Sequence, residues 1–166
     1  MFEKLGLRVA TTDYEYLDEG AYSVVFVDRA QGKVCKVYLA TQPIDHSRKV
    51  FAEEIEAYKK ANAQKDLKSL VPAFYATTSI QQIIDKDGND VTSKFYPALA
   101  FESEHIPQRF KKANMAAPEK ELARVKDLFR KHGINHLSDI SAWVEEGKIR
   151  KVLDFAVNEI VPSWDD

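Results

Sequence analysis

The feature that most constrains the fold is a pair of apolar runs rich in Val, Phe and Tyr, separated by a short polar turn. The first run spans residues 17–27 and the second spans residues 33–38, and both have the β-branched and aromatic composition of strands. The segment Asp28–Gly32 between them contains the Asp and Gly residues that suit a hairpin connection. The sequence therefore predicts an antiparallel strand pair, and with it a β-sheet in the first part of the protein.

A lysine, Lys36, interrupts the second run. Because side chains alternate between the two faces of a strand, Lys36 is expected on the same face as Val34 and Tyr38. One interpretation is a half-exposed sheet, on which the lysine stem covers apolar surface while its ammonium group stays in water. The other interpretation is a contact between Lys36 and the phosphates of a nucleotide.

A helix with one carboxylate on its apolar face is expected next, over His46–Ala61. Its apolar residues recur at intervals of four and three: Phe51, Ile55 and Tyr58. At about 100° per residue, Glu54 falls on this apolar face. A carboxylate that faces the core needs a cation, and Lys36 is the nearest candidate.

Composition limits the class of protein. The chain has 166 residues, of which 45% are hydrophobic and 30% charged, so it forms one soluble domain or two small lobes. Its single cysteine, Cys35, excludes a disulfide scaffold and is interpreted as a packing residue in a strand. The net charge of −2, from 24 basic and 26 acidic residues, argues against a nucleic-acid-binding or anionic-membrane surface. The sequence shows no transmembrane run and no signal peptide, so we expect a cytoplasmic location.

Three further strands are expected, over residues 7–16, 79–84 and 95–101. The last two are predicted to form a hairpin through the polar segment 85–90, and Pro97 suits an edge or a bulge. With the strand pair and the helix described above, this gives about five strands and one helix.

The second part of the chain is expected to be mainly helical. Residues 102–118 lose the strand periodicity and contain two prolines and a basic cluster, Arg109–Lys112. A helix follows over Pro118–His132, and Gly133 supplies its end. Its buried residues are expected to be Leu122, Val125, Leu128 and Phe129.

The strand lysine followed by a helix glutamate resembles the N-terminal lobe of protein-kinase-like proteins, in which a Gly-rich loop precedes the lysine. The Gly-rich pattern is matched by Asp18, Gly20, Ser23 and Val25, so one of its three glycines is present. The resemblance implies that residues 101–104 are the hinge that binds adenine, with a surface loop as the alternative. The nucleotide-binding residues that it implies are Gly20, Ser23, Val25, Val34, Lys36, Glu54 and Glu102.

The C-terminal part resembles the catalytic loop, short hairpin and Asp-Phe-Gly segment of the same family. A hydrophobic strand ends in Asp154 and Phe155, although Ala156 replaces the usual glycine. Aligned without gaps, His136 takes the place of the catalytic aspartate and Ser141 that of the metal-binding asparagine. Aligned instead on the histidine of the catalytic loop, Asp139 becomes the candidate base or metal ligand.

The resemblance implies an α+β, protein-kinase-like fold. The expected N-lobe, residues 1–102, has a five-stranded antiparallel sheet and one helix, and residues 103–166 are expected to form the hinge and a short, truncated, mainly helical C-lobe. ATP and Mg²⁺ are the implied cofactors, with Asp154 and Ser141 as metal ligands and His136 or Asp139 as the catalytic group. The matched region corresponds to the first half to two thirds of a full-length kinase.

Two functions follow from the resemblance. The first is an atypical ATP/Mg²⁺-dependent phosphotransferase, and the second is a catalytically inactive pseudokinase that acts as a protein-binding or inhibitory module. Either implies a protein substrate or a protein partner, to which Trp164 is a candidate anchor if it does not cap the second lobe. The nearest class is the minimal kinase-like proteins of bacterial effectors and phages, which would place the protein in a host cytoplasm. A third reading is an α+β domain in which the matches are coincidental.

Overall fold

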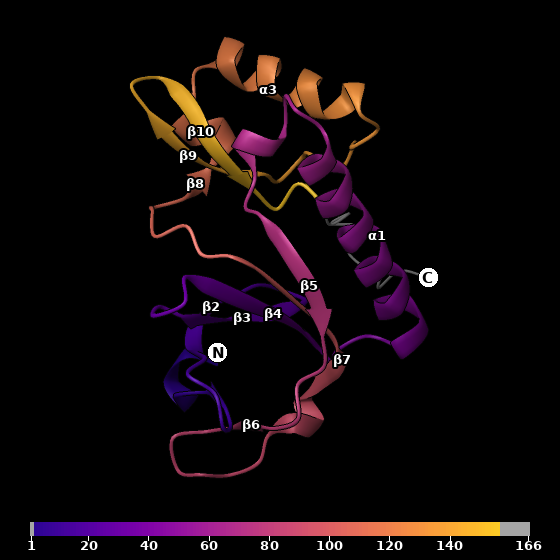
Figure 1. Cartoon of the computed structure of the whole chain (residues 1–166), viewed down its shortest axis with the longest axis vertical. Helices are drawn as coiled ribbons and strands as arrows, with labels where there is room; N and C mark the ends of the chain where they lie inside the picture. Colours follow the sequence, from indigo (N-terminus) through magenta and orange to yellow (C-terminus); the bar gives the residue numbers. More distant parts are fainter. Residues whose placement is uncertain (1, 157–166) are drawn as a thin grey trace. The chain divides into compact units, whose positions relative to one another are not determined.

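The computed structural model describes residues 2–156 and has an α+β fold (Figure 1). The chain divides into two compact units. Unit 1 consists of Met1–Phe51 and Phe74–Ile106, and unit 2 consists of Ala52–Ala73 and Pro107–Asp166. Helix α1 (Ile44–Ala63) contributes to both, since the boundary falls within it. Trp164 lies outside the described residues.

Unit 1 is built on an antiparallel sheet. Among the described residues it has seven strands in the order β5-β7-β4-β3-β2-β1-β6. The strands are β1 (Arg8–Val9), β2 (Glu15–Glu19), β3 (Ser23–Asp28), β4 (Lys33–Leu39), β5 (Phe74–Thr78), β6 (Ile83–Ile84) and β7 (Phe95–Glu104). β3 and β4 pair from Ser23 with Tyr38 to Asp28 with Lys33, which confirms the predicted hairpin.

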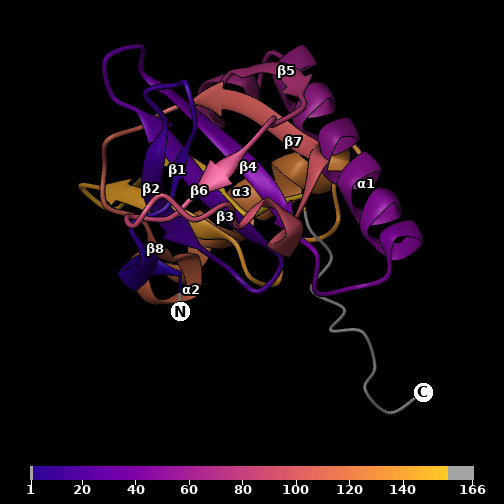
Figure 2. The ribbon, with the colours of Figure 1, turned by 90° about the horizontal axis from the view of Figure 1, so that it is seen from below.

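One face of this sheet carries the apolar core of unit 1. Its residues are Leu7, Val9, Tyr14, Val24, Phe26, Cys35, Val37, Leu39, Ile80, Ile83, Phe95 and Ala100. β1 and β6 pair with each other and add Val9 and Ile83 to this core (Figure 2). Cys35 is fully buried, as its expected packing role requires, and burial raises the pKa of its thiol to about 12.

The opposite face of the sheet is covered by aromatic rings. Phe51, at the unit 1 end of α1, makes an edge-on contact with Tyr38 of β4 at a ring distance of 5.4 Å. Phe101 of β7 lies between Phe51 and Phe74, at 6.3 and 6.0 Å. Both faces of the central strands are therefore buried, because β4 alternates between the two layers.

The predicted hairpin between residues 79–84 and 95–101 is wrong, and with it the count of five strands. β7 pairs with β5, whereas β6 pairs with β1. The reason is local hydrogen bonding: the backbone N–H of Ile83 donates to the Thr92 hydroxyl at 2.9 Å, so it is satisfied without a partner in β7. Pro97 lies where the register between β4 and β7 shifts, which confirms that it occupies a bulge.

Unit 2 combines the end of α1 with two helices and a small sheet. The helices are α2 (Ala113–Ala116) and α3 (Glu119–Lys131), and the strands are β8 (Lys111–Lys112), β9 (Ser141–Glu145) and β10 (Lys148–Leu153). Within residues 2–156 the three strands form one sheet in the order β10-β9-β8. The expected mainly helical C-lobe is therefore wrong for the described part of the chain, because two residues of the basic cluster add a strand to the β9–β10 hairpin.

Both predicted helices are present. α1 begins two residues before and ends two residues after the expected range, and α3 begins just after Pro118, which precedes the first helical residue. Val125 and Phe129 of α3 are fully buried, whereas Leu122 and Leu128 are half-buried. Short 3-10 helices occupy Glu3–Leu5, Lys68–Leu70 and Thr92–Lys94.

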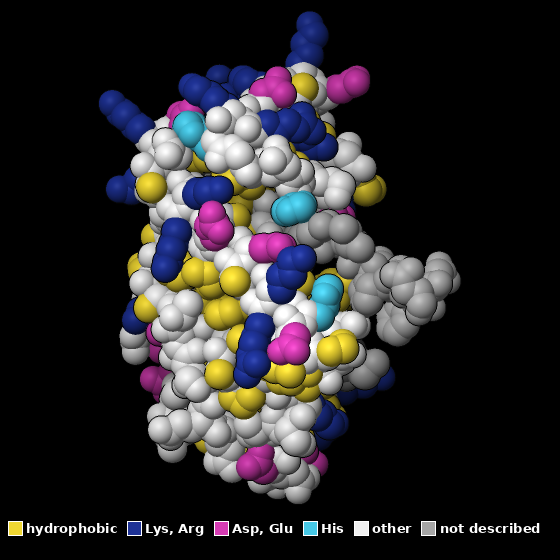
Figure 3. All heavy atoms as spheres, turned by 90° about the vertical axis from the view of Figure 1, so that its right-hand side faces the viewer, with side chains coloured by type: hydrophobic (Ala, Val, Ile, Leu, Met, Phe, Trp, Pro, Cys, Tyr) yellow, Lys and Arg dark blue, Asp and Glu magenta, His cyan; other side chains and the backbone are white. Residues whose placement is uncertain are grey.

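The surface carries both signs of charge. On the face drawn in Figure 3, Lys and Arg side chains are interspersed with those of Asp and Glu, in keeping with 24 basic and 26 acidic residues in the sequence. None of the described helices has the length and apolar character needed to cross a membrane.

The core of unit 1 gives a first prediction. Phe26 is fully buried in it, so Phe26→Ala should lower the free energy of unfolding by about 3–5 kcal/mol. Leu17→Ala on the neighbouring strand β2 is the control, because Leu17 is 36% exposed and should change stability by less than about 0.5 kcal/mol. Urea denaturation followed by circular dichroism measures both. Equal losses for the two variants would show that this core is assigned to the wrong face.

A carboxylate in unit 2 gives a prediction about pH. The His132 ring nitrogen Nε2 lies 2.8 Å from Asp66 Oδ1, and this hydrogen bond is the main reason why the pKa of Asp66 is below its usual value. A lowered pKa in the folded state means that the interaction stabilises the protein above about pH 4 and is lost as pH falls through the folded pKa.

Asp66→Asn should therefore lower the melting temperature at pH 7, and the difference from wild type should disappear below the folded pKa. Asp87→Asn, in an exposed loop, is the matched control and should leave the melting temperature unchanged at both ends of the range. Differential scanning fluorimetry between pH 2 and pH 7 measures this, and a difference that persists in acid would contradict the assignment.

Candidate functional site

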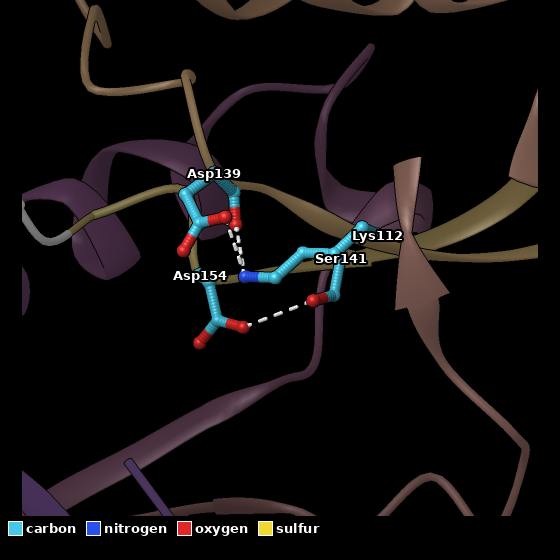
Figure 4. A network of polar contacts seen from close by, with 4 residues as sticks. All are labelled: Lys112, Asp139, Ser141 and Asp154. Atoms are coloured by element: carbon cyan, nitrogen blue, oxygen red, sulfur yellow. Dashed lines mark hydrogen bonds and ion pairs between the residues drawn. The ribbon is translucent and has the colours of Figure 1, made fainter. Parts of the chain in front are cut away.

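Four polar side chains of unit 2 come together beside the small sheet: Lys112, Asp139, Ser141 and Asp154. The ammonium group of Lys112 pairs with the Asp139 carboxylate and also donates to its backbone carbonyl at 3.3 Å. The Ser141 hydroxyl donates to Asp154 Oδ2 at 3.2 Å. Figure 4 shows Lys112 extending toward Asp139 and Ser141 facing Asp154, as two neighbouring pairs. This cluster contains three of the residues that the sequence singled out.

The strand register brings these residues together from three separate places in the chain. Lys112 of β8 lies opposite Ser141 of β9. Ser141 in turn lies opposite Leu153, the last residue of β10, so Asp154 follows directly beside it. Asp139 lies two residues before the start of β9. The pairing of three short strands therefore defines the cluster.

Asp154 has an unusual backbone conformation. Its φ is 62°, in the left-handed region that residues other than glycine seldom adopt, although aspartate tolerates it better than most. Such a conformation costs of order 1–3 kcal/mol and persists only where the surroundings impose it. Outliers of this kind concentrate at functional sites, which makes Asp154 a stronger candidate than its sequence context alone.

The neighbouring Phe155 explains how this conformation is held. Its side chain is fully buried, with ring distances of 4.7 Å to Tyr58 of α1 and 5.3 Å to Phe129 of α3. Burial raises the pKa of the Tyr58 hydroxyl, and the nearby carboxylates of Glu54 and Asp154 raise it further. Phe155 thus fixes the chain directly after Asp154, while Asp154 itself remains exposed.

The cluster offers oxygen donors of the kind that Mg²⁺ prefers. These are the carboxylates of Asp154 and Asp139 and the hydroxyl of Ser141. No group of three or more His, Cys, Asp or Glu side chains placed to hold a metal ion occurs in residues 2–156. A role of these oxygens as ligands of Mg²⁺ stays a prediction.

His136 lies in a different setting from Asp139. It lines a small cavity of about 140 Å³ together with Phe155, Ala156 and the α1 residues Glu53 and Lys60. Asp139, three residues later, contacts Lys112 instead. Of the two catalytic candidates, the structure therefore brings Asp139 into the polar cluster and places His136 beside this cavity.

Lys36 belongs to unit 1 and Glu54 belongs to unit 2. Lys36 is half-buried on β4, where its cross-strand neighbours are Val25 and Phe101. Glu54 is 1% exposed, so its expected place on the apolar face of the helix is confirmed. The pairing of Lys36 with Glu54 stays a prediction, and so does the contact of Lys36 with phosphate.

The segment that matches the Gly-rich loop is a tight turn between β2 and β3. The Gly20 N–H donates to the Ser23 carbonyl at 2.9 Å, and the Leu39 N–H donates to the Tyr22 carbonyl at 2.8 Å. Ser23 is buried, Gly20 is exposed, and Val25 and Val34 are both half-buried in adjacent strands. A nucleotide-binding role for these four residues stays a prediction.

Glu102 lies within β7, which continues to Glu104, so the expected loss of strand structure begins later than predicted. Its carboxylate accepts a hydrogen bond from the Tyr14 hydroxyl at 2.5 Å. Burial, and next this hydrogen bond, raise the pKa of Tyr14. Both side chains line a cavity of about 360 Å³ next to the buried Cys35.

Lys112 is the functional candidate that sequence reasoning missed. The sequence identified it only as one member of the basic cluster Arg109–Lys112. A strand of two residues is too short to show a periodic pattern. Its partner strand β9 lies far away in the sequence, so local sequence patterns do not reveal the pairing of Lys112 with Ser141.

Comparison with known proteins adds no assignment: no protein-family model matches the chain, and no curated protein matches it significantly in sequence.

Proposed function

We propose that the protein is an atypical ATP- and Mg²⁺-dependent phosphotransferase of the protein-kinase-like class. The observation that carries the proposal is the cluster in which Asp154, at the end of a strand and in a left-handed conformation, contacts Ser141 beside the Lys112–Asp139 pair. Phosphoryl transfer requires a metal-binding carboxylate, a cation for the phosphates and a group that orients the acceptor. Unit 2 supplies candidates for the metal-binding carboxylate, Asp154, and for the orienting group, Asp139.

The residues have distinct roles in this proposal. Asp154 and Ser141 hold Mg²⁺, which would neutralise charge on the nucleotide phosphates. Lys36 contacts the phosphates and Glu54 orients it, as the family resemblance implies. Asp139 orients the acceptor hydroxyl and takes up its proton. Lys112 positions the Asp139 carboxylate, because its ammonium group contacts both that carboxylate and the Asp139 backbone carbonyl.

The reaction itself is a simple displacement. The oxygen of an acceptor hydroxyl attacks the γ-phosphorus of ATP, the bond from that phosphorus to the bridging oxygen breaks, and ADP leaves with the bonding electron pair. The hydroxyl proton passes to the Asp139 carboxylate. The neighbouring Lys112 ammonium group is then available to offset negative charge on the transferred phosphoryl group.

Unit 1 provides secondary support. Five contiguous strands of its sheet, β2, β3, β4, β7 and β5, carry the lysine on the central strand and are interrupted in sequence by α1. A kinase-like N-lobe is expected to have five strands and one helix, so this sheet exceeds the expected inventory by two strands. The strands β1 and β6 are additions at one edge of the sheet.

The catalytic assignment is tested by autophosphorylation and by transfer to a generic protein substrate, with radiolabelled ATP. Asp154→Ala and Asp139→Ala should each reduce transfer at least 100-fold, because each removes a group that acts in the transition state. His136→Ala should retain most of the activity, since His136 lines a small cavity to which none of the four cluster residues contributes.

Melting temperatures of the three variants show whether the fold is kept. If wild type and Asp154→Ala incorporate radiolabelled phosphate at the same background level, the proposed phosphotransferase activity is refuted. Loss of activity in His136→Ala with retention in Asp139→Ala would instead assign His136 as the catalytic group.

The same cluster also favours a second candidate, an inactive protein-binding module. Lys112 already engages Asp139 through both its carboxylate and its carbonyl, and Ser141 is a weaker metal ligand than the asparagine of active kinases. If the ion pair between Lys112 and Asp139 persists, the Asp139 carboxylate does not accept the proton of the acceptor hydroxyl. The protein then serves only to bind a partner.

Thermal stability with ATP and Mg²⁺ separates the two candidates. Ligand at 100 times its dissociation constant should add about 2.7 kcal/mol, which raises the melting temperature of a chain of this size by about 5–10 °C. The shift should be lost in Lys36→Met, whereas Lys33→Met on the same strand should keep it. Absence of a shift in wild type would favour the binding module.

A further inference from the structure

A groove of about 630 Å³ crosses unit 2 on the small sheet. It is lined by the segment that precedes α3 and by β9 with the turn that follows it. The lining residues that matter here are Arg109, Lys111, Met115, Trp143 and Glu146. None of the proposed catalytic or metal-binding residues lines it.

The groove has an apolar part that is open to solvent. Met115 is 84% exposed, and Trp143 is half-buried in the lining. Trp and Met are enriched in protein–protein interfaces, where a partly buried tryptophan often dominates the binding energy. A methionine exposed to this degree next to such a tryptophan is typical of a surface that is covered by a partner.

Two cations at the groove lack a counter-ion. Arg109 and Lys111 are both exposed, and neither makes an ion pair within residues 2–156. The adjacent Lys112 does make one, with Asp139. The groove lining therefore combines an apolar patch with two exposed cations and one carboxylate, that of Glu146.

Strand geometry separates this groove from the polar cluster. Successive residues of β8 point to opposite sides of the sheet, so Lys111 lines the groove while Lys112 contacts Asp139. Lys111 lies opposite Ala142, and Lys112 lies opposite Ser141. Ligand binding in the groove and chemistry at the cluster can therefore be tested independently.

We propose that this groove binds an acidic segment of another protein. An aliphatic or aromatic side chain of the segment packs on Trp143 and Met115, and its carboxylates pair with Arg109 and Lys111. The proposal does not depend on phosphotransfer activity and holds for an enzyme or for a binding module. Charge complementarity selects the acidic partner, and the apolar patch supplies most of the affinity.

A protein segment suits this surface better than a nucleic acid does. Binding of a nucleic acid depends on several phosphate contacts, whereas the groove offers two unpaired cations and carries the carboxylate of Glu146 at its margin. The chain as a whole has a net charge of −2, which disfavours a polyanion further.

The test uses a short fluorescein-labelled peptide that alternates Glu with Leu and Phe, and a second peptide in which each Glu is replaced by Lys. Fluorescence anisotropy measures binding to the full-length protein. The sequence has two tryptophans, so in a Trp164→Phe background the emission of Trp143 reports occupancy of the groove directly. We expect the acidic peptide to bind and to change Trp143 emission, and its affinity to fall as salt is raised.

Substitutions locate the site. Arg109→Glu with Lys111→Glu should weaken binding of the acidic peptide at least tenfold, and Met115→Glu should weaken it by a similar factor. The matched control is Lys148→Glu with Arg150→Glu, which makes the same charge change at two exposed residues of the same sheet outside the groove. This control should keep binding within twofold, and all variants should keep the wild-type melting temperature.

Several results would overturn the proposal. These are equal binding of the basic peptide, equal loss in the control variant, and no response of Trp143. Tighter binding of a single-stranded oligonucleotide would assign the groove to nucleic acid. Dimerisation in sedimentation experiments that Arg109→Glu with Lys111→Glu abolishes would assign it to a second copy of this chain. Asp154→Ala should bind the peptide normally, so failure of the enzyme and failure of the groove are distinguishable.

Discussion

The packing of Phe155 between Tyr58 and Phe129 is the contact on which the candidate site depends. The three rings belong to the segment that follows β10, to α1 and to α3, and all three side chains are buried. Because Phe155 cannot leave this cluster without exposing a large apolar surface, the preceding residue, Asp154, is held in its left-handed conformation. The apolar core of unit 2 therefore positions a carboxylate that itself faces solvent.

The Lys112–Asp139 pair contributes little to stability, and this makes its presence informative. The side chains are 48% and 32% exposed, and ion pairs in such surroundings contribute about 0–1 kcal/mol. A packing requirement does not explain why both residues lie beside Asp154 and Ser141. In the proposed phosphotransferase this pair positions the Asp139 carboxylate.

Local patterns predicted much of the structure, and long-range pairing limited the rest. The periodicity of the chain identified α1, α3, the β3–β4 hairpin and the buried Glu54, because each depends on residues a few positions apart. The pairing of β5 with β7 and of β6 with β1 was not predicted, because strand pairing joins residues that lie far apart in the sequence. The polar cluster was predicted in part: Asp154 ends a recognisable strand, whereas Lys112 enters only through the two-residue strand β8.

The two-residue strand β8 contributes one residue, Lys111, to the groove and the other, Lys112, to the polar cluster. Its two residues are held to β9 by the register of Lys111 with Ala142 and of Lys112 with Ser141, and short edge strands of this kind are easily displaced. A partner that binds against Lys111 and Trp143 would stabilise this pairing, because it covers the two paired strands, β8 and β9, that carry these residues. Stabilising the pairing fixes Lys112 beside Ser141 and hence beside Asp139. The alternation of side chains along β8 thus places Lys111 in the groove and Lys112 in the polar cluster, so one two-residue strand contributes to both surfaces.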